Sequence, residues 1–376
     1  TKQLRRNLQH KRFAVTIDLK AWFHQFPLDI AVRDFFVFRV DNDYYRYTRL
    51  PMGFSHAVDI AQETLELLWS TCAYNIFADL YIDNILIADV SKERVEEATQ
   101  KFLRVLTTFG VTVGELTAAT HFPVHRGVQF DLLGQRCALK KSFAEHIRYV
   151  PPRQPWYLFR KLICRIIYAT SVLDFPRAFL FHTIKWATAH QFTHTNAKLT
   201  LPEFIVTEMQ KASEILSTTS VPLTYARPQM TIITDASKTG YGYIVVNNET
   251  HSFSSHQGHW TVQQQAYHIN VLELSAILLA LQKVSSASIH IITDNTTAMW
   301  SIRSTYSPSP AITAVLTDIF SIAAKNNLHL TTSFVPTSMN PADPLSRNET
   351  PQWDYATSLF LSSLLLGWGG EEPMFS

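Results

Sequence analysis

The sequence has few cysteines, almost no net charge and no long apolar run, and each shortage excludes a class of protein. Its three cysteines lie far apart and show neither a disulfide framework nor the paired spacing of a zinc site; they are Cys72, Cys137 and Cys164. Such sparse use of cysteine favours a reducing compartment inside the cell, the cytoplasm or the nucleus.

Signals for export and for membrane insertion are also missing. No secretory signal opens the chain. The longest late apolar stretch, Leu359–Leu366, is broken by two serines and is much shorter than the roughly 20 residues that cross a bilayer. We therefore expect no membrane partner. The start at Thr1 rather than at a methionine predicts a fragment of a longer protein.

The composition is that of a globular protein. Of 376 residues, 46% are hydrophobic and 17% are charged, which is enough for two or three domains with buried cores. The net charge of +2 does not indicate a nucleic-acid partner. Five basic residues crowd the first dozen positions, where they would either meet phosphates or form a solvated end; they are Lys2, Arg5, Arg6, Lys11 and Arg12.

The periodicity of the first half predicts strands and helices in alternation. An apolar strand over residues 13–17 ends at Asp18, and a hairpin is expected over residues 35–48. A helix capped by Ser55 should run to Trp69, and an amphipathic helix should run from Ser91 to Phe109. A second hairpin is expected around Asp83.

The second half begins with an irregular helical periodicity of its apolar residues, and a regular strand pattern starts near residue 230. A strand from Met230, a helix over Val271–Leu281 and a strand over Ile289–Thr293 predict a compact α/β domain over residues 223–350. The chain shows no internal repeat.

Two aspartates of the first half stand where a two-metal phosphoryl-transfer site needs them. Asp18 ends a strand and Asp83 lies at a hairpin tip, so that together they could hold the cations that activate a 3′-hydroxyl and stabilise a leaving oxygen. Taken singly, each also has a structural explanation. Asp83 with Asn84 is a good turn dipeptide, and Asp18 could simply end its strand.

Four acids of the second half form a similar ordered set: Asp235, Glu273, Asp294 and Asp343. Four carboxylates converging at strand ends and a helix start can hold two Mg²⁺ about 4 Å apart. Each acid has a structural alternative. Glu273 could pair with Asn270 in a capping box, Asp294 or Asn295 could cap a helix, Asp235 could hold a hairpin, and Asp343 could form a turn.

The words around the first two aspartates resemble the palm motifs of reverse transcriptases of long retroelements. In order they are IDLKAWFHQ (Ile17–Gln25), LPMGFSHA (Leu50–Ala57) and YIDN (Tyr81–Asn84), and the segment Gly127–Asp131 resembles the hairpin near the primer grip. The resemblance implies that Asp18 and Asp83 are catalytic metal ligands.

The same resemblance implies the residues that bind nucleotide. Phe23 matches the aromatic gate that excludes a ribose 2′-hydroxyl, which implies synthesis of DNA. The other nucleotide-binding candidates in the matched words are Gln25, Pro51, Met52, Gly53 and Tyr81.

Three features depart from the family pattern. Asn84 stands where the family has a second hairpin carboxylate, and an amide oxygen brings no charge to a cation. Glu115 stands near the position of a lysine that protonates pyrophosphate. Most of the fingers segment that would precede Asp18 is missing. These departures put polymerase activity in doubt.

The words around the four later acids resemble the ribonuclease H domain of retroelements, and within them the DIRS-like tyrosine-recombinase retrotransposons, which include the VIPER elements. They are TDAS (Thr234–Ser237), INVLEL (Ile269–Leu274), TDNTT (Thr293–Thr297) and NPADPLSR (Asn340–Arg347). By this resemblance all four acids are catalytic and bind metal. The histidine that retroviral enzymes carry shortly before the last aspartate is absent from residues 334–338.

The predicted fold is α+β followed by α/β. Residues 1–145 should form a reverse-transcriptase palm, 146–222 a helical thumb or connection, 223–350 a five-stranded mixed ribonuclease H-like sheet, and 351–376 a tail. The resemblance implies RNA-templated DNA synthesis and cleavage of RNA in RNA–DNA hybrids, with two Mg²⁺ or Mn²⁺ per site. The implied partners are an RNA template, a DNA primer, the hybrid and dNTPs.

Three alternatives stay open. One is a degenerate retroelement copy that binds hybrids without performing chemistry. Another is an unrelated two-domain hydrolase that uses the later acids on a different phosphodiester, and the third is a structural scaffold. The oligomeric state does not follow from the sequence.

Overall fold

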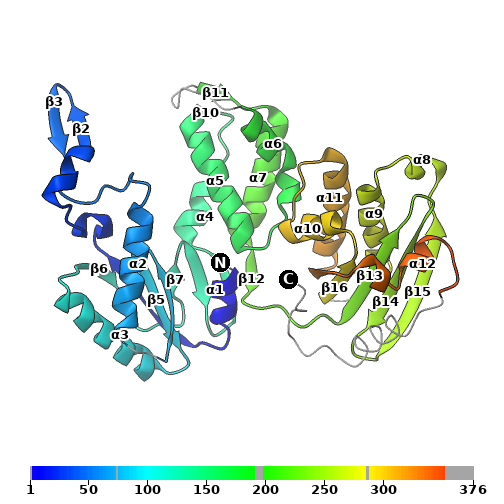
Figure 1. Ribbon diagram of the computed structural model, residues 1–376, viewed down its shortest axis with the longest axis horizontal. Coiled ribbons are helices and arrows are strands. Elements are labelled where there is room, and N and C mark those ends of the chain that lie inside the picture. Colours follow the sequence, from blue (N-terminus) through cyan, green and yellow to red (C-terminus); the bar gives the residue numbers. More distant parts are fainter. Residues whose placement is uncertain (1, 73–74, 191–197, 285–287, 352–376) are drawn as a thin grey trace. The chain divides into compact units, whose positions relative to one another are not determined.

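The computed structural model describes residues 2–72, 75–190, 198–284 and 288–351, and its chain divides into two compact units (Figure 1). The first unit comprises Thr1–Tyr149, Ser171–Asp174 and Ser213–Thr224, and the remainder forms the second. The stretch Leu359–Leu366 and all but the first residue of the expected tail lie outside the described residues. Within the described part, no helix is long and apolar enough to cross a membrane.

A four-stranded antiparallel sheet is the centre of the first unit. Its order is β4 (Phe77–Tyr81), β5 (Asn84–Asp89), β1 (Phe13–Leu19) and β6 (Val113–Leu116). Helices α2 (Ala57–Ser70) and α3 (Lys92–Thr108) pack on one face of this sheet, because Ile17 and Ile87 of the strands share one buried cluster with Leu65 and Phe102 of the helices. The polar ends of β1 and of the β4–β5 hairpin remain outside this core.

The ends of these two helices test the predicted caps. Helix α3 forms within the predicted span Ser91–Phe109: Ser91 caps it by accepting a hydrogen bond from the Arg94 backbone N–H, and Gly110 adopts a left-handed φ of 70° just after it. The predicted cap at Ser55 is wrong. Helix α2 starts at Ala57, because residues 52–56 form turns and the Ala57 N–H bonds back to the Phe54 carbonyl oxygen.

The smaller elements of the first unit surround this sheet. The predicted hairpin forms as β2 (Val37–Val40) and β3 (Asp43–Arg46), and both strands are exposed. A second sheet has the order β12 (Ser220–Pro222), β9 (Arg136–Leu139), β8 (Val128–Asp131), β7 (Val124–His125). The remaining elements are α1 (Lys2–Asn7), η1 (Trp22–Gln25), η2 (Ile30–Phe35) and α4 (Lys141–Ile147).

A group of helices forms the first part of the second unit. They are α5 (Trp156–Val172), η3 (Arg177–Leu180), α6 (Phe181–Ala189) and α7 (Glu203–Thr218), with a short pair β10 (Arg153–Pro155) and β11 (Lys198–Thr200). The ends of α5 and α7 cluster with the first unit. The predicted boundaries at residues 145 and 222 therefore stay predictions.

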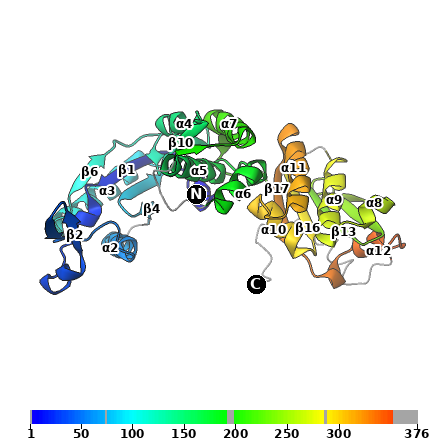
Figure 2. The ribbon, with the colours of Figure 1, turned by 90° about the horizontal axis from the view of Figure 1, so that it is seen from above.

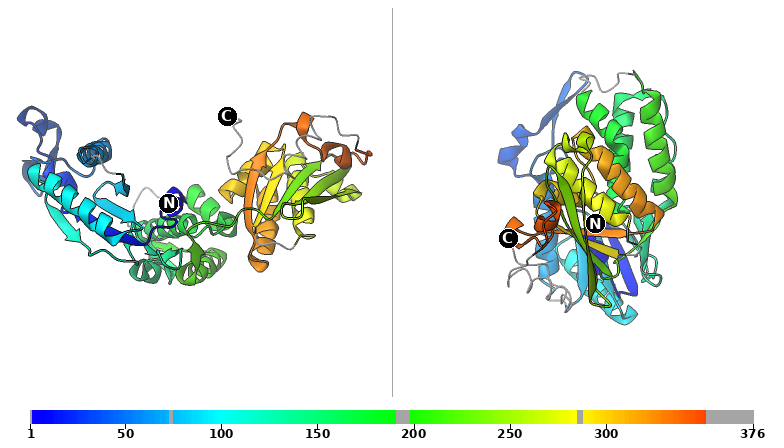
Figure 3. Two further views of the ribbon diagram at one scale, coloured as in Figure 1. Left: turned by 90° about the horizontal axis from the view of Figure 1, so that it is seen from below. Right: turned by 90° about the vertical axis from the view of Figure 1, so that its right-hand side faces the viewer.

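A five-stranded mixed sheet is the centre of the second unit, and it follows the predicted pattern. Its order is β15 (Ser252–His259), β14 (Gly240–Asn247), β13 (Met230–Ala236), β16 (Ser288–Thr293) and β17 (His329–Phe334). The first three strands are antiparallel neighbours, whereas β13, β16 and β17 run parallel. Figure 3 shows the sheet from two further sides.

Helices cover both faces of this sheet. The larger core packs α9 (Ile269–Leu281), α10 (Thr296–Ser304) and α11 (Pro310–Lys325) against one face. On the other face, Leu345 of α12 (Asp343–Ser346) packs against Ile233 and Ile244. Figure 2 shows α9 and α11 on one side of β13 and β16, and α12 on the other. The short elements α8 (Val262–Gln265) and η4 (Thr337–Met339) complete the unit.

Candidate active sites

Three acids of the second unit converge at one edge of the mixed sheet. Asp235 lies near the end of β13, and Asp294 directly follows β16, so the parallel pairing of these strands brings both to the same edge. Glu273 comes from the first two turns of α9. Each of the three offers a carboxylate oxygen, and these oxygens lie within 4.8 Å of one another. Such spacing suits a divalent cation with oxygen ligands.

The burial of this cluster controls its charge. Asp235 is 5% exposed and Glu273 is 4% exposed. Burial, together with the neighbouring carboxylates, raises the pKa of Glu273 to about 9. Burial likewise raises the pKa of Asp235 to about 7, against a hydrogen bond from Ser346 that lowers it. Without a cation, Glu273 therefore keeps its proton near neutral pH, and Asp235 keeps its proton in part.

Two carboxylate oxygens of the cluster are unsatisfied hydrogen-bond acceptors within the described protein. Among the described residues, Glu273 Oε2 and Asp294 Oδ1 are buried and have no hydrogen-bond partner. A buried acceptor without a partner is costly unless something else satisfies it. The donor set consists of carboxylate oxygens, which are the ligands that Mg²⁺ and Mn²⁺ prefer. The residues present therefore fit such a cation.

The structure assigns the alternative structural roles to other side chains. His268, not Asn270, caps α9, so the capping box that would have occupied Glu273 does not form. Asn295 caps α10 through the Ala298 N–H, which leaves Asp294 out of the cap. The turn before β14 is held by Ser237, whose hydroxyl accepts the Gly240 N–H. Asp235, Glu273 and Asp294 therefore do not serve as the helix caps or the turn residue that the structural alternatives required.

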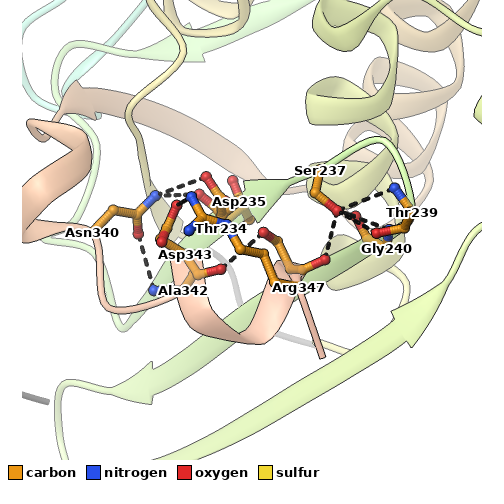
Figure 4. Close-up of polar contacts among 10 residues, drawn as sticks. Thr234, Asp235, Ser237, Thr239, Gly240, Asn340, Ala342, Asp343 and Arg347 are labelled. Carbon is orange, nitrogen blue, oxygen red and sulfur yellow. Dashed lines mark hydrogen bonds and ion pairs between the residues drawn. The ribbon is translucent and has the colours of Figure 1, made fainter. Parts of the chain in front are cut away.

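Asp343 sits beside this group rather than within it. It begins α12 and pairs with Arg347 at 2.7 Å, one helical turn further on (Figure 4). Asp343 is close enough to Asp235 for its charge to raise the Asp235 pKa. Burial raises the pKa of Asp343 itself, although Arg347 opposes this. Without a bound cation, Asp343 is paired with Arg347, which compensates its charge.

Asn340 joins the two acid-bearing segments. Its buried amide nitrogen donates to the Thr234 carbonyl oxygen at 3.1 Å and more weakly to Asp235 Oδ1 at 3.4 Å (Figure 4). Its amide oxygen accepts the Ala342 N–H, next to Asp343. The sequence alone assigns no role to Asn340 or Arg347, although both stand inside the motif NPADPLSR.

The first unit brings its two predicted aspartates to neighbouring strand ends. Asp18 pairs with Asn84 of β5 on one side and with Glu115 of β6 on the other. Asp83 lies in the β4–β5 turn, where its backbone carbonyl accepts the Leu19 N–H at 2.8 Å. Burial, followed by the charges of Asp83 and Glu115, raises the pKa of Asp18. The charges of Asp83 and Glu115 therefore both act on Asp18 at this end of the sheet.

Asn84 and Glu115 change the charge pattern around Asp18. Directly opposed residues of antiparallel strands point to the same face, so both side chains flank Asp18. The Asn84 amide donates to Asp83 Oδ1 at 2.7 Å. In the sequence, Glu115 stands out only as a replacement for a lysine, because the strand register across β1 and β6 is not visible there.

The predicted nucleotide-binding residues lie in several places. Pro51 is buried, whereas Met52 and Gly53 are exposed in the turn before α2. Phe23 of η1 packs at the margin of the core. Tyr81 ends β4 and is 43% exposed.

Gln25 is engaged within the protein. Its amide nitrogen donates to the carbonyl oxygens of Lys20 and Thr112, and its amide oxygen accepts the Thr112 N–H. These bonds tie η1 to the segment before β6 and use the donors of the amide. A nucleotide contact by Gln25 stays a prediction.

Comparisons with known proteins agree with this architecture. Residues 1–115 match the family described as "Reverse transcriptase (RNA-dependent DNA polymerase)". Over 96 residues the chain is 31% identical to the "Retrovirus-related Pol polyprotein from transposon 412" of Drosophila melanogaster, and the match covers 25% of the chain and 8% of the polyprotein.

Solved structures of foamy viral protease-reverse transcriptase match most of this chain. The structure in complex with an RNA/DNA hybrid has a TM-score of 0.50 and 12% identity, and covers 87% of this chain and 45% of that one. A second, in complex with double-stranded DNA, has a TM-score of 0.48 and 14% identity, and covers 86% and 57%. The chain thus spans about half the length of these structures.

The fold and the matches define the class of protein. The chain has the fold of a reverse-transcriptase palm with a helical connection, followed by a ribonuclease H-like sheet domain. Residues 1–115 match the reverse transcriptase family, and part of the chain is similar to a retrotransposon Pol polyprotein. The predicted fold class is confirmed.

Proposed function

We propose that the protein cleaves the RNA strand of RNA–DNA hybrids at the cluster of Asp235, Glu273 and Asp294, and that its palm copies RNA into DNA. The observation that carries the nuclease is the cluster itself, in which two buried carboxylate oxygens have no partner in the described protein. Buried carboxylate oxygens without partners are costly, and a catalytic metal site explains why they are present.

The chemistry follows from the donor set. Two Mg²⁺ or Mn²⁺ ions would supply an activated water and stabilise the departing 3′-oxygen. Asp235, Glu273 and Asp294 would hold them, and Asp343 would join after exchanging its bond to Arg347. Because Glu273 and Asp235 hold protons near neutral pH, cation binding would release these protons.

The polymerase proposal rests on the domain match and on the position of Asp18 and Asp83. These two acids would bind the metal-bound dNTP, with Phe23, Tyr81 and the turn Pro51–Gly53 near the nucleotide. An RNA template, a DNA primer and dNTPs are the proposed substrates. The structural relative bound to an RNA/DNA hybrid supports a nucleic-acid partner of this kind.

We also propose a retrotransposon subtype and a cellular location for the protein. The sequence motifs NPADPLSR and TDNTT support assignment to the DIRS-like retrotransposons, including the VIPER type. The three described cysteines are free, which supports a reducing location in the cytoplasm or the nucleus.

One alternative has a specific observation in its favour. Asn84 removes a carboxylate from the palm, and Glu115 places a negative charge beside Asp18 where a proton donor was expected. A copy that binds hybrids without polymerase activity would show these features in its palm. It would not explain the cluster in the second unit.

The first experiment is cleavage of an end-labelled RNA strand in an RNA–DNA hybrid, with Mg²⁺ or Mn²⁺. We expect cleavage of the RNA alone, leaving a 3′-hydroxyl. Asp294→Asn should lower the rate at least about 100-fold, because it weakens a cation ligand. The matched control is Asp318→Asn on the exposed face of α11, which should cleave at the wild-type rate.

The outcomes separate the candidates. RNA cleavage that is lost in Asp294→Asn alone supports the nuclease. Cleavage of either strand without preference would indicate an unrelated hydrolase. A folded protein that binds the hybrid in a salt-sensitive way but never cuts it would indicate the degenerate copy.

A further inference from the structure

A tight turn brings Arg126 out of the small sheet of the first unit. Strands β7 and β8 pair through His125 and Val128, and the two residues between them both have positive φ, 52° at Arg126 and 75° at Gly127. Two successive left-handed residues form the turn that matches the twist of a hairpin. For an arginine this conformation is unfavourable, so other contacts must stabilise it.

The contacts come from β4 of the palm sheet. His125 is 2% exposed, and its Nε2 lies 2.8 Å from Asp79 Oδ2. Arg126 Nη1 lies 3.5 Å from the same oxygen. Burial alone would raise the pKa of Asp79, but the bonds and charges of His125 and Arg126 hold it below its usual value. One carboxylate of the palm thus anchors two successive residues of the hairpin.

The Arg126 guanidinium also covers an aromatic ring. Its central carbon lies 3.9 Å from the centroid of the Tyr81 ring, a close cation–π contact. Tyr81 ends β4 two residues after Asp79 and two residues before Asp83. Strand β4 and the turn after it therefore carry an anchor for Arg126, the ring that Arg126 stacks on, and a candidate metal ligand within five positions.

A purely structural link between hairpin and sheet needs only the Asp79 pair. That pair is buried around His125 and would fix the hairpin without Arg126. The stack on Tyr81 is additional, and it lies on a side chain that is still 43% exposed. A guanidinium that pairs with Asp79 and stacks on the partly exposed Tyr81 ring restricts the positions of that ring.

We propose that Arg126 is a positioning residue for Tyr81, fixed by Asp79 and His125, so that the ring is held in place for the incoming nucleotide beside Asp83. This inference rests on the proposed polymerase. It links the hairpin after the palm to the nucleotide site through a contact in which Arg126 touches neither substrate nor metal. The affinity for nucleotide should therefore depend on Arg126 more than the chemical step does.

The test compares Arg126→Ala, Arg126→Lys, Tyr81→Ala and the double variant in primer extension with Mn²⁺. Binding of dTTP with Mn²⁺ is measured in parallel by calorimetry. Arg104→Ala on the exposed face of α3 is the control. Circular dichroism spectra and melting temperatures show whether each variant folds.

We expect Arg126→Ala to raise KM and Kd for the nucleotide about 10-fold while kcat changes less than about 3-fold. Arg126→Lys keeps the charge near Asp79 but loses the flat stacking surface, so its KM should lie in between. The double variant should be no worse than Tyr81→Ala, because the two residues act as one unit.

Additive losses in the double variant would overturn the proposal, and so would a loss confined to kcat. If a variant melts lower but binds dTTP as wild type does, the contact is only structural and the proposal fails. Absence of extension by the wild type would count against the proposed polymerase alone. In that case the dTTP binding of the four variants still decides the role of Arg126.

Discussion

At the scale of single residues, the most informative groups are the acids whose ionised forms are disfavoured by burial and by neighbouring carboxylates. Glu273 and Asp235 are buried next to other carboxylates, so their protonated forms are favoured in the folded protein. A divalent cation would replace these protons and satisfy the two oxygens that lack partners. The pH dependence of stability is therefore a direct probe of the cluster.

The first prediction concerns this pH dependence. Because the folded-state pKa of Glu273 is raised to about 9, the folded protein keeps a proton that the unfolded chain has already released above its ordinary pKa. The folded state then binds more protons, so stability falls as pH rises from about 5 to about 9. We expect the metal-free melting temperature of the wild type to fall by at least about 5 °C over this range.

Glu273→Gln should remove most of this fall, since the amide cannot ionise. Mn²⁺ should raise the melting temperature of the wild type more at pH 8 than at pH 6. Glu249→Gln, at an exposed turn, is the control and should follow the wild type. A flat wild-type profile in the absence of metal would contradict the prediction.

The second prediction concerns the palm. Asn84→Asp restores the carboxylate that the family carries, but it also removes the donor to Asp83 Oδ1 and adds a charge beside Asp18. Without metal, we expect a loss of about 1–3 kcal/mol in the free energy of unfolding. With Mn²⁺, the variant should gain more stability than the wild type does.

Melting curves with and without Mn²⁺ measure this difference. Asn42→Asp, in the exposed turn between β2 and β3, is the matched control. Equal responses of Asn84→Asp and the wild type to Mn²⁺ would show that residue 84 does not face a cation.

At the scale of elements, the position of α12 decides whether the fourth acid can reach the cluster. Helix α12 lies directly on β14, where Gly240 and Gly242 leave room for its backbone. Asn340 and the bond from the Ser237 hydroxyl to the Ser346 carbonyl oxygen hold its two ends. Asp343 therefore depends on close packing by a helix of only four residues.

The third prediction is that Gly242→Ala displaces α12. An added Cβ would lie 2.4 Å from Leu345 Cβ and 2.8 Å from the Ser346 backbone nitrogen, so the helix must move. We expect a cost of about 1–3 kcal/mol in the free energy of unfolding. Cleavage of the hybrid should fall at least 10-fold, because Asp343 moves with the helix.

Gly258→Ala separates this effect from damage to the strands. Its Cβ would meet the Tyr241 ring rather than α12. It should lower the melting temperature but retain cleavage. If Gly242→Ala cleaves at the wild-type rate while its melting temperature falls, α12 does not position an acid that the reaction needs.

At the scale of the whole molecule, the two candidate active sites belong to different compact units. Asp18 and Asp83 lie in the first unit, and the cluster of Asp235, Glu273 and Asp294 lies in the second. Each site is built within its own unit, from strand ends together with a turn in the first unit and helix α9 in the second. The two chemistries should therefore be separable by single substitutions.

The fourth prediction follows from this separation. Asp18→Asn should lower primer extension at least about 100-fold and leave hybrid cleavage within about 2-fold of wild type. Asp235→Asn should do the reverse. Both activities are measured on the same preparation, so each variant is the control for the other. Loss of both activities in one folded variant would mean that the sites are coupled.

Local signals in the sequence were sufficient for much of the fold. The cap at Ser91, the stop at Gly110 and the period of the apolar residues between them set the bounds of α3. Apolar strands ending in Asp235 and Asp294 were visible because burial on both faces demands continuous apolar residues. The order of the acids along the chain also predicted one set of four, of which the structure brings Asp235, Glu273 and Asp294 together and leaves Asp343 beside them.

The contacts that define the sites were decided only by the tertiary structure. Whether Glu273 caps a helix or joins a cluster depends on His268 taking the cap and on α9 starting at the edge of β13. The facing of Asp18 and Glu115 and the stack of Arg126 on Tyr81 depend on strand register and on a turn. The sequence by itself determined the elements, because their signals act over a few neighbouring residues. Partners far apart in the chain are chosen by packing, which only the folded structure determines.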